Sequence, residues 1–306
     1  MADKITDETH FLKTLADSAN EFEVVLENVL SETPPPGETA RPQRLVEAMR
    51  HSALGGGKRL RPFLFTQSAA LFSPAHNPAS AGCALELIHC YSLVHDDLPA
   101  MDDDDMRRGK PTVHIAFDEA TAILAGDSLL TLAFDLIARE ATHPDPQVRI
   151  ELVQLLAAAS GLGGMAGGQM FDLMAETQTP DAEQIKRLQA MKTGALLRFA
   201  CEGGAVFGGA TADETLALKR YGEALGEAFQ LADDLLDLTA DAATMGKATG
   251  KDAQAGKGTL VGLMGEDAAR KELDRLVQEA MDCLSPFGDR AAMLRRTALF
   301  VASRDH

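Results

Sequence analysis

Two long segments of this chain are apolar around nearly the whole circumference of a helix. They cover residues 120–138 and 194–207. A helix of this kind is buried among other elements, because it has no polar face to turn toward water. No segment alternates strictly between apolar and polar residues, as a half-buried strand would. The sequence therefore predicts an all-α protein in which helices enclose other helices.

Proline and glycine divide the chain into separate helices. Prolines lack a backbone donor and clash with the preceding turn, so the proline-rich residues 33–42 cannot be helical. We predict a helix after residue 80 that ends at 96–98, and further helices over residues 8–30, 44–54, 62–71, 112–140, 146–160, 164–176, 180–208, 213–237, 267–283 and 289–303. No long linker and no repeat with a solenoid period is present. We therefore expect a single domain over residues 1–306, built as one large helical bundle.

Charge and cysteine usage limit the classes of partner. The formal net charge of −17 disfavours nonspecific binding to nucleic acid or to an anionic membrane. The polar N-terminal residues do not form a signal peptide, and no apolar run has the length of a membrane span. The four cysteines show neither a CxxC nor a zinc-ligand spacing. These features predict a cytoplasmic protein with free thiols, no nucleic-acid partner and no membrane insertion.

The most acidic segment follows an apolar helix that carries His89 and Tyr91. Six aspartates occupy ten positions (Asp96, Asp97 and Asp102 to Asp105), and Arg107, Arg108 and Lys110 follow them. Two like charges about 4 Å apart repel by roughly 4 kcal/mol at an effective dielectric near 20, so such a cluster favours protonation of some carboxylates or bound cations.

The spacing within this segment favours magnesium. We expect Asp96 on the last helical turn, with the loop around Pro99 folding Asp102 back beside it. Mg²⁺ suits such a pair, because it takes one or two carboxylates together with substrate phosphates. An EF-hand calcium loop is excluded, since Arg107 stands where that loop needs glycine. A solvated acidic loop is the remaining alternative.

A second aspartate motif, FQLADDLLD, covers residues 229–237. Asp233 and Asp237 are four residues apart and therefore lie on one face of a helix. Gln230 lies one turn earlier, close to that face. Carboxylates on a solvated helix face are the alternative, but two such motifs in one helical protein favour a metal site.

Basic residues next to glycines form a third group. Lys58 and Arg61 lie in GGGKRLR before a helix N-terminus, which is a natural anion site. Lys192 and Thr193 lie in MKTGAL, and the glycine-rich residues 246–258 contain Lys247, Lys251 and Lys257. That loop does not match a P-loop, because Gly258 follows Lys257 where Ser or Thr is required. Each lysine alone could be a solvated surface residue. Together with the aspartates they predict a diphosphate held between metal ions and cationic side chains.

One glycine-rich segment, residues 161–172, also carries polar side chains. Its glycines are costly in a helix and favour close helix packing. Gln169 and Asp172 are three residues apart on one face, so they can support the cations from a second layer.

These motifs match a family in their identity and order. DDLPAMD, FQLADDLLD, GGGKRLRP, MRRGKPTVH, GQMFDL, KTGAL and GKATGKD together resemble the trans-isoprenyl diphosphate synthases of the bacterial farnesyl diphosphate synthase type, over about residues 45–257. The resemblance implies an all-α bundle, usually a homodimer, with the two aspartate helices facing each other across a deep central cavity.

The resemblance also implies a reaction. Three Mg²⁺ ions, with Mn²⁺ as an alternative, bind the diphosphate of dimethylallyl or geranyl diphosphate. The C–O bond ionises, isopentenyl diphosphate attacks the allylic cation, and a proton is lost, giving farnesyl diphosphate. Metals and lysines aimed at the leaving diphosphate stabilise its developing charge, and apolar walls protect the cation from water.

The resemblance assigns roles residue by residue. The metal ligands are Asp96 and Asp102 with Asp97 in support, and Asp233 with Asp237 nearby. The allylic diphosphate is held by Arg107, Lys192 and Lys247. Isopentenyl diphosphate is held by Gly57, Lys58, Arg61, His89 and Arg108. Thr193 and Gln230 stabilise the cation with their oxygen dipoles.

In the family that the chain resembles, the residue five positions before the first aspartate forms the floor of the product pocket, and here that residue is Tyr91. At 1.5 Å per residue it lies about 7 to 8 Å from Asp96 along the helix. A large aromatic side chain there, and the two extra residues of the first motif, favour a fifteen-carbon product. A geranylgeranyl diphosphate synthase, a terpene cyclase and a non-enzymatic regulatory subunit are the alternatives. One departure from the family is Leu260-Val261, which replaces the usual Tyr-Pro.

Overall fold

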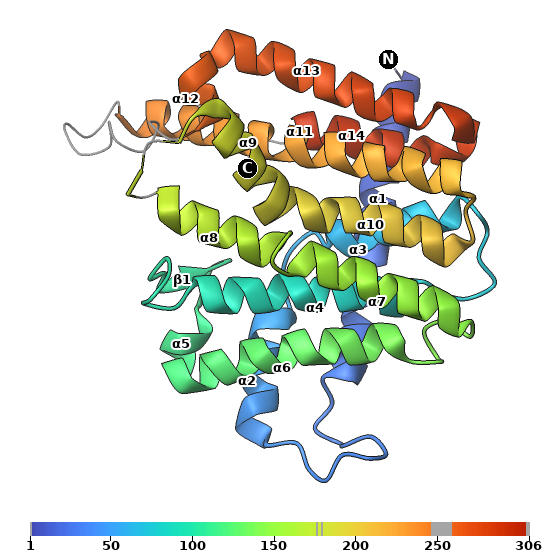
Figure 1. Cartoon of the computed structure of the whole chain (residues 1–306), viewed down its shortest axis with the longest axis vertical. Helices are drawn as coiled ribbons and strands as arrows, with labels where there is room; N and C mark the ends of the chain where they lie inside the picture. Colours follow the sequence, from blue (N-terminus) through green and yellow to red (C-terminus); the bar gives the residue numbers. More distant parts are fainter. Residues whose placement is uncertain (1, 176, 179, 246–258, 304–306) are drawn as a thin grey trace. The chain divides into compact units, whose positions relative to one another are not determined.

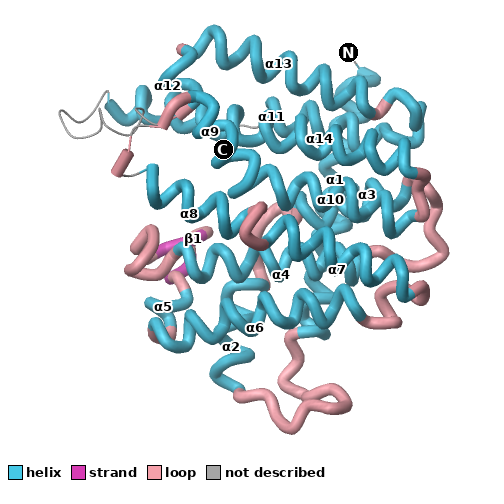
Figure 2. Tube along the Cα trace, viewed as in Figure 1, coloured by secondary structure: helices cyan, strands magenta, loops and turns pink. Residues whose placement is uncertain are grey.

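The computed structural model describes residues 2–175, 177–178, 180–245 and 259–303 of the chain. Contacts divide it into two compact units, residues 1–154 and 155–306, and each unit is described by itself. Figure 1 shows the course of the chain and Figure 2 its secondary structure. Helices make up nearly all regular structure of the described residues, so the predicted all-α class is confirmed. The single domain stays a prediction.

The first unit is organised around one helix. It contains α1 (Ala2–Val29), α2 (Gln43–Ala53), α3 (Leu60–Ala70), α4 (Ala79–Asp96), α5 (Val113–Ala116) and α6 (Glu119–Ala138). α4 contacts α1, α2, α3 and α6. Its side chains are buried on several faces, including Leu85, Leu87 and Ile88. The helix that carries His89, Tyr91 and Asp96 is therefore the central helix of this unit.

The second unit is built around two long helices. After α7 (Pro146–Ser160), which spans the boundary, come α8 (Met165–Ala175), α9 (Ala182–Gln189), a π-helical turn η1 (Ala190–Gly194), α10 (Ala195–Gly208), α11 (Ala212–Met245), α12 (Leu260–Met264), α13 (Glu266–Cys283), η2 (Ser285–Ala291) and α14 (Ala292–Ser303). α11 contacts α10, α13 and α14. The hydroxyl of the buried Tyr221 donates to the Leu294 carbonyl at 2.7 Å and so joins α11 to α14.

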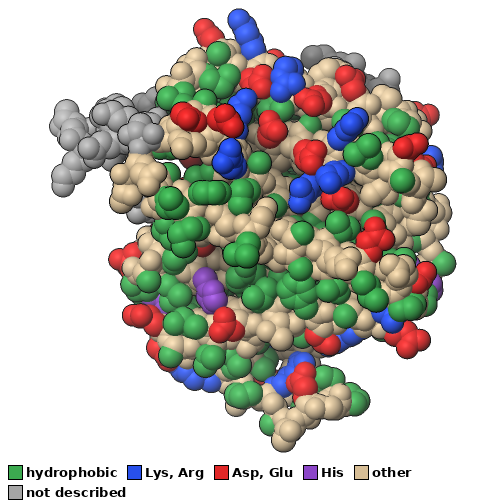
Figure 3. All heavy atoms as spheres, in the orientation of Figure 1, with side chains coloured by type: hydrophobic (Ala, Val, Ile, Leu, Met, Phe, Trp, Pro, Cys, Tyr) green, Lys and Arg blue, Asp and Glu red, His purple; other side chains and the backbone are tan. Residues whose placement is uncertain are grey.

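The predicted enclosure of the apolar helices holds for α10 and only partly for α6. α10 buries residues around most of its circumference, from Ala195 to Phe207. α6 buries one side, which includes Leu129 and Ala133 and packs on α4. Its other side exposes Ile123 at 45% and Leu124 at 55%. Figure 3 shows apolar side chains at the surface in this region.

Four local features differ from the expected helices. A two-stranded hairpin joins β1 (Met106–Arg107) to β2 (Lys110–Pro111). The expected helix 112–140 breaks into α5 and α6 because the Asp118 carboxylate accepts from the Thr121 amide and caps α6. The expected helix 180–208 contains the π turn. The short α12 begins after Thr259, whose side chain accepts from the Gly262 amide.

Two stretches, Glu119–Ala138 and Pro146–Ala175, have the length and apolar composition of a membrane span, although no uninterrupted apolar run was found in the sequence. This is a weak indication, because core helices of soluble proteins have the same composition. The first stretch is α6, whose buried side packs against α4.

Candidate functional site

The first aspartate motif folds back on itself at the end of α4. The Asp102 amide donates to the Asp96 carbonyl at 2.8 Å, and the Met101 amide donates to the Leu98 carbonyl at 2.8 Å. The Asp104 amide donates to the Asp97 carbonyl at 3.2 Å. These bonds confirm that the loop around Pro99 brings Asp102 beside Asp96.

The carboxylates of this loop differ in their surroundings. Asp102 is exposed and Asp96 is half-buried, whereas only 3% of Asp97 is exposed. Asp97 accepts a hydrogen bond from Arg107 Nε at 2.6 Å. Burial raises the pKa of Asp97, and Arg107 opposes that rise. Asp97 therefore joins the acidic loop to the basic hairpin, while Asp102 stays open to solvent.

Asp104, to which the sequence assigned no role, orders the same hairpin. Its carboxylate lies 3.3 Å from Arg107, and its carbonyl accepts from the Thr112 hydroxyl at 2.8 Å. The spacing of three residues between Asp104 and Arg107 is the sequence signal for this ion pair.

The hairpin turns through two residues in the left-handed region. Arg108 has φ 52° and Gly109 has φ 74°, which is the pattern of a type I′ turn. A Cβ on Gly57 would lie 3.1 Å from Arg108 Cζ, and a Cβ on Gly55 would lie 3.0 Å from Lys110 Nζ. The hairpin thus lays Arg108 and Lys110 directly over the glycine loop.

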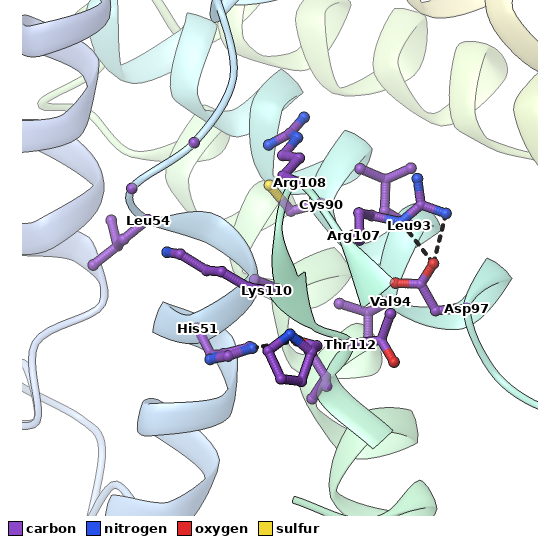
Figure 4. Close-up of a pocket in the computed structure, with 15 residues that line it drawn as sticks. His51, Leu54, Cys90, Leu93, Val94, Asp97, Arg107, Arg108, Lys110 and Thr112 are labelled. Carbon is purple, nitrogen blue, oxygen red and sulfur yellow. Dashed lines mark hydrogen bonds and ion pairs between the residues drawn. The ribbon is translucent and has the colours of Figure 1, made fainter. Parts of the chain in front are cut away.

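A cavity of about 50 Å³ lies where these elements meet (Figure 4). Its walls come from α2, the glycine loop, the end of α4 and the hairpin. Arg108 and Lys110 make one side cationic, and the Asp97–Arg107 pair stands at the other. His51 closes the bottom, with Nε2 at 2.7 Å from the Pro111 carbonyl. The cavity therefore combines a flexible glycine backbone with positive charge, as an anion site requires.

Arginines also surround His89. The pKa of His89 is lowered well below its ordinary value, first by burial, then by the positive charges of Arg61 and Arg108, and further by Arg59 and Arg107. The imidazole is therefore neutral near pH 7. Arg61 and Arg108, which the sequence placed in one anion site with His89, thus both lie within electrostatic range of its imidazole. Lys58 is exposed in the adjoining loop.

Tyr91 lies on α4 one and a half turns before Asp96, and it is half-buried. Burial raises its pKa, and the charge of Asp96 adds to the rise. Its ring meets the His95 ring edge to face, with centroids 5.9 Å apart. His95 lies against Gly126 of α6, where an added Cβ would come within 2.1 Å of Nε2. The close approach of α4 to α6 therefore fixes the ring beside Tyr91.

In the second unit, Lys192 lies in the π turn η1, a rare geometry that is frequent at functional sites. Two glycines permit other helices to pack closely on this turn. A Cβ on Gly168 of α8 would lie 2.2 Å from the Lys192 amide nitrogen, and a Cβ on Gly226 of α11 would lie 2.9 Å from Gly194 Cα. The Lys192 amine contacts the Asp172 carboxylate of α8 at 2.5 Å. Thr193 is the next residue of the same turn.

The amide group of Gln169 is buried, and neither its oxygen nor its nitrogen has a hydrogen-bond partner among the described residues. A buried amide without partners costs free energy. Gln169 lies on α8 one turn before Asp172, which pairs with Lys192. Its amide group is therefore available to bind an additional polar ligand near this pair.

The second aspartate motif lies within α11. Asp233 and Gln230 are half-buried, and Asp237 is exposed. Asp234, which the sequence left without a role, accepts from Gln189 Nε2 at 3.1 Å and from the Leu260 amide. Burial is the main cause that raises the pKa of Asp234. This residue therefore ties the motif to α9 and α12.

Leu260 and Val261, which replace the Tyr-Pro that is usual in the resembled family, have a structural role. Both side chains are buried at the start of α12, at 7% and 3% exposure. Lys247, Lys251 and Lys257 lie outside the described residues, so their predicted roles have no structural description.

The donor set of the described residues fits magnesium better than zinc or a closed metal cage. Within this part of the chain, no three His, Cys, Asp or Glu side chains gather in a way that could hold a metal ion. Each aspartate motif instead offers carboxylates beside cationic or amide groups. Mg²⁺ is held in this manner, through one or two carboxylates and the phosphates of its substrate.

Comparison with known proteins gives a consistent result. Residues 42–286 match the model of the polyprenyl synthetase family. The chain is 46% identical over 251 residues to the farnesyl diphosphate synthase of Escherichia coli K12, covering 81% of this chain and 84% of the other. It is 42% identical over 271 residues to geranylgeranyl pyrophosphate synthase 11 of Arabidopsis thaliana, covering 86% and 75%. A crystal structure of an FPP/GFPP synthase from Zymomonas mobilis superposes with a TM-score of 0.86 at 44% identity, covering 97% and 100%.

Proposed function

The chain belongs to the polyprenyl synthetase family, and we propose on this basis that it condenses isopentenyl diphosphate with dimethylallyl diphosphate and then with geranyl diphosphate to make farnesyl diphosphate. It is a trans-prenyltransferase of the farnesyl diphosphate synthase type and has the isoprenoid synthase fold. The predicted cavity between the two aspartate helices stays a prediction.

One observation carries this proposal within the structure. The Asp97–Arg107 pair links a folded-back acidic loop to a cationic cavity. A metal-bound diphosphate and a metal-free diphosphate can therefore be held next to each other. The condensation of two prenyl diphosphates needs this arrangement, because the diphosphate group of one substrate must leave while that of the other stays attached to its carbon chain.

The family generally uses Mg²⁺. We assign five aspartates to hold three such ions, namely Asp96, Asp97, Asp102, Asp233 and Asp237, with Asp97 acting in support. Bound magnesium supplies Lewis acidity that stabilises the charge on the leaving diphosphate. Arg107, Lys192 and Lys247 add positive charge to the same group. The contact of Lys192 with Asp172 supports this role, because it holds the lysine amine in place.

The second substrate is assigned to the glycine loop of the first unit, where Arg108 joins that loop to the cationic cavity. Gly57 offers a backbone without a side chain, while Lys58, Arg61 and Arg108 neutralise the diphosphate of isopentenyl diphosphate. His89 is neutral because its pKa is lowered, so it contributes a hydrogen bond rather than a charge. The double bond then attacks the allylic cation, and a proton leaves the product. Thr193 and Gln230 direct oxygen dipoles at the cation.

Tyr91 is proposed to set the product length. Its half-buried ring meets the His95 ring, which packs against Gly126, and we propose that it forms the floor of the substrate space along α4 below Asp96. The alternative product is geranylgeranyl diphosphate, which the plant relative is named for. A terpene cyclase would not need Lys58 and Arg61, and both are present in the glycine loop.

We also propose a cytoplasmic homodimer. The homodimer is expected from the family resemblance, and Ile123 and Leu124 of α6 are exposed apolar side chains that a partner subunit could cover.

Condensation assays test this function. The protein is incubated with isopentenyl diphosphate and geranyl diphosphate, with Mg²⁺ or with EDTA. We expect Mg²⁺-dependent release of diphosphate. Asp102→Ala and Asp233→Ala should each slow this release, because the loss of a metal ligand raises the activation free energy by several kcal/mol. Asp145→Ala, on the exposed residue before α7, is the control and should retain activity. Activity that survives EDTA and both motif variants would refute the mechanism.

A further inference from the structure

The glycine loop contains one arginine that faces inward. Arg59 stands between the exposed Lys58 and the first turn of α3, yet only 3% of it is exposed. Its backbone is left-handed, with φ 50° and ψ 39°. A residue with a side chain is uncommon in this conformation, so other contacts must hold it there.

Two glutamates from distant helices bind this side chain. Arg59 Nη1 lies 2.7 Å from Glu86 of α4, and these side chains are 2% and 3% exposed. Arg59 Nη2 lies 2.9 Å from Glu23 of α1 and also donates to the Ala53 carbonyl at the end of α2. The guanidinium therefore connects three helices at one point.

Glu23 also holds the start of the same loop. Its other carboxylate oxygen accepts from the amide of Gly55. One carboxylate thus binds both the first residue of the loop and Arg59 at its end. The segment between them contains Gly57, with φ 84°, and Lys58.

A buried ion pair of this kind is a poor source of stability. Desolvation of both charges offsets their attraction, and apolar replacements often stabilise as well or better. A buried ion pair is better explained when it selects one backbone geometry among several. A glycine-rich loop has many accessible backbone geometries, so an ion pair has most effect in such a loop.

We propose that Glu23, Arg59 and Glu86 form a clamp that positions the glycine loop for isopentenyl diphosphate. By drawing Arg59 inward, the clamp turns Lys58 outward and sets the start of α3, where Arg61 lies near His89. All three are positioning residues, because each acts through the loop. This inference rests on the proposed function of that loop.

Steady-state kinetics on Glu86→Gln and Arg59→Lys test the clamp. Glutamine keeps the shape of Glu86 without its charge, and lysine keeps the charge of Arg59 without its planar fork. We expect KM for isopentenyl diphosphate to rise about tenfold or more, because the loop no longer holds its binding geometry. KM for geranyl diphosphate and kcat should stay within about twofold of the parent values.

Arg41→Lys is the matched control. Arg41 is also largely buried, pairs with Glu38 and binds the Val29 and Ser31 carbonyls at the end of α1, away from the glycine loop. This variant should lower the melting temperature and leave both KM values unchanged. If Glu86→Gln and Arg59→Lys behave in the same way, or if they change both KM values and kcat together, the clamp is refuted.

Glu23→Gln provides a milder variant, since Glu23 is 29% exposed and its loss leaves the Arg59–Glu86 pair intact. Calorimetric binding of isopentenyl diphosphate alone should weaken in this variant, and unchanged affinity would overturn the proposal. This measurement needs no turnover. If the parent protein binds isopentenyl diphosphate but is inactive, the proposed function is contradicted, and the clamp can still be tested by this binding measurement.

Discussion

Gly168→Ala should disturb the π turn that carries Lys192, the residue proposed to bind the allylic diphosphate. An added Cβ would lie 2.2 Å from the Lys192 amide nitrogen and 2.6 Å from its Cα. Ordinary contact begins near 3.4 Å, so the two backbones must separate by about 1.2 Å, the difference between these distances. The obstacle is backbone and cannot rotate away.

Two opposing effects decide the outcome. Alanine favours a helix over glycine by about 1 kcal/mol, whereas overpacking of this kind costs about 1–3 kcal/mol. We therefore expect a net loss of stability of up to about 2 kcal/mol. Because α8 also carries Asp172, the separation displaces Lys192 from its ion pair. A displacement of about 1 Å can cost a hundredfold in rate, which corresponds to about 2.7 kcal/mol.

The assay is kcat/KM for geranyl diphosphate with thermal unfolding measured on the same sample. Gly163→Ala is the control, because its added Cβ meets nothing within 4 Å. We expect Gly168→Ala to lose about a hundredfold in kcat/KM and the control to stay near the parent value. Parent-like activity in folded Gly168→Ala would refute the view that tight packing of Gly168 on η1 places Lys192.

Three further predictions concern single residues. Tyr91→Ala should release products longer than fifteen carbons, and unchanged products by chromatography would exclude Tyr91 as the floor. His89→Gln should change the pH dependence of unfolding. The pKa of His89 is lowered in the folded protein. Below about pH 6.5 the unfolded parent chain therefore binds a proton that the folded chain does not bind. The parent should therefore lose stability relative to His89→Gln as pH falls below 6.5 and show a constant difference above it; parallel curves at all pH values would exclude a buried neutral imidazole. Asp97→Asn should remove the charge that pairs with Arg107 and reduce kcat/KM for both substrates; an effect on only one of them would show that the pair does not link the two subsites.

The parts of the site that depend on local sequence were predictable. Pro99 ends α4 and turns the chain, so Asp102 returned beside Asp96 as expected. Asp233 and Asp237 are separated by one helical turn, which fixes their common face whatever surrounds them. Helical spacing likewise placed His89 and Tyr91 on the helix that ends in the acidic loop.

The parts that depend on long-range packing were not predictable. Gly168 and Gly226 let two other helices pack closely on the π turn η1, and no local pattern in residues 190–194 indicates either this packing or the π geometry. The hairpin escaped detection because its strands have only two residues each and Arg108 occupies a left-handed position. The role of Asp234 required α9 and α12 to meet it.

Arg59 illustrates the same limit most clearly. In the sequence it is one of three basic residues in GGGKRLR, and the family resemblance gives roles only to Lys58 and Arg61. Its partners come from α1 and α4, far apart in the chain. Only the packing of those helices turns one cation inward and leaves its neighbour in solvent.

Product identification tests the central claim most directly. The purified protein is incubated with Mg²⁺, isopentenyl diphosphate and, separately, dimethylallyl or geranyl diphosphate, and the dephosphorylated products are separated by chromatography and identified by mass. We expect farnesol from both primers. Geranylgeraniol as the main product would contradict the assigned chain length, and no condensation with either primer would contradict the proposed function itself.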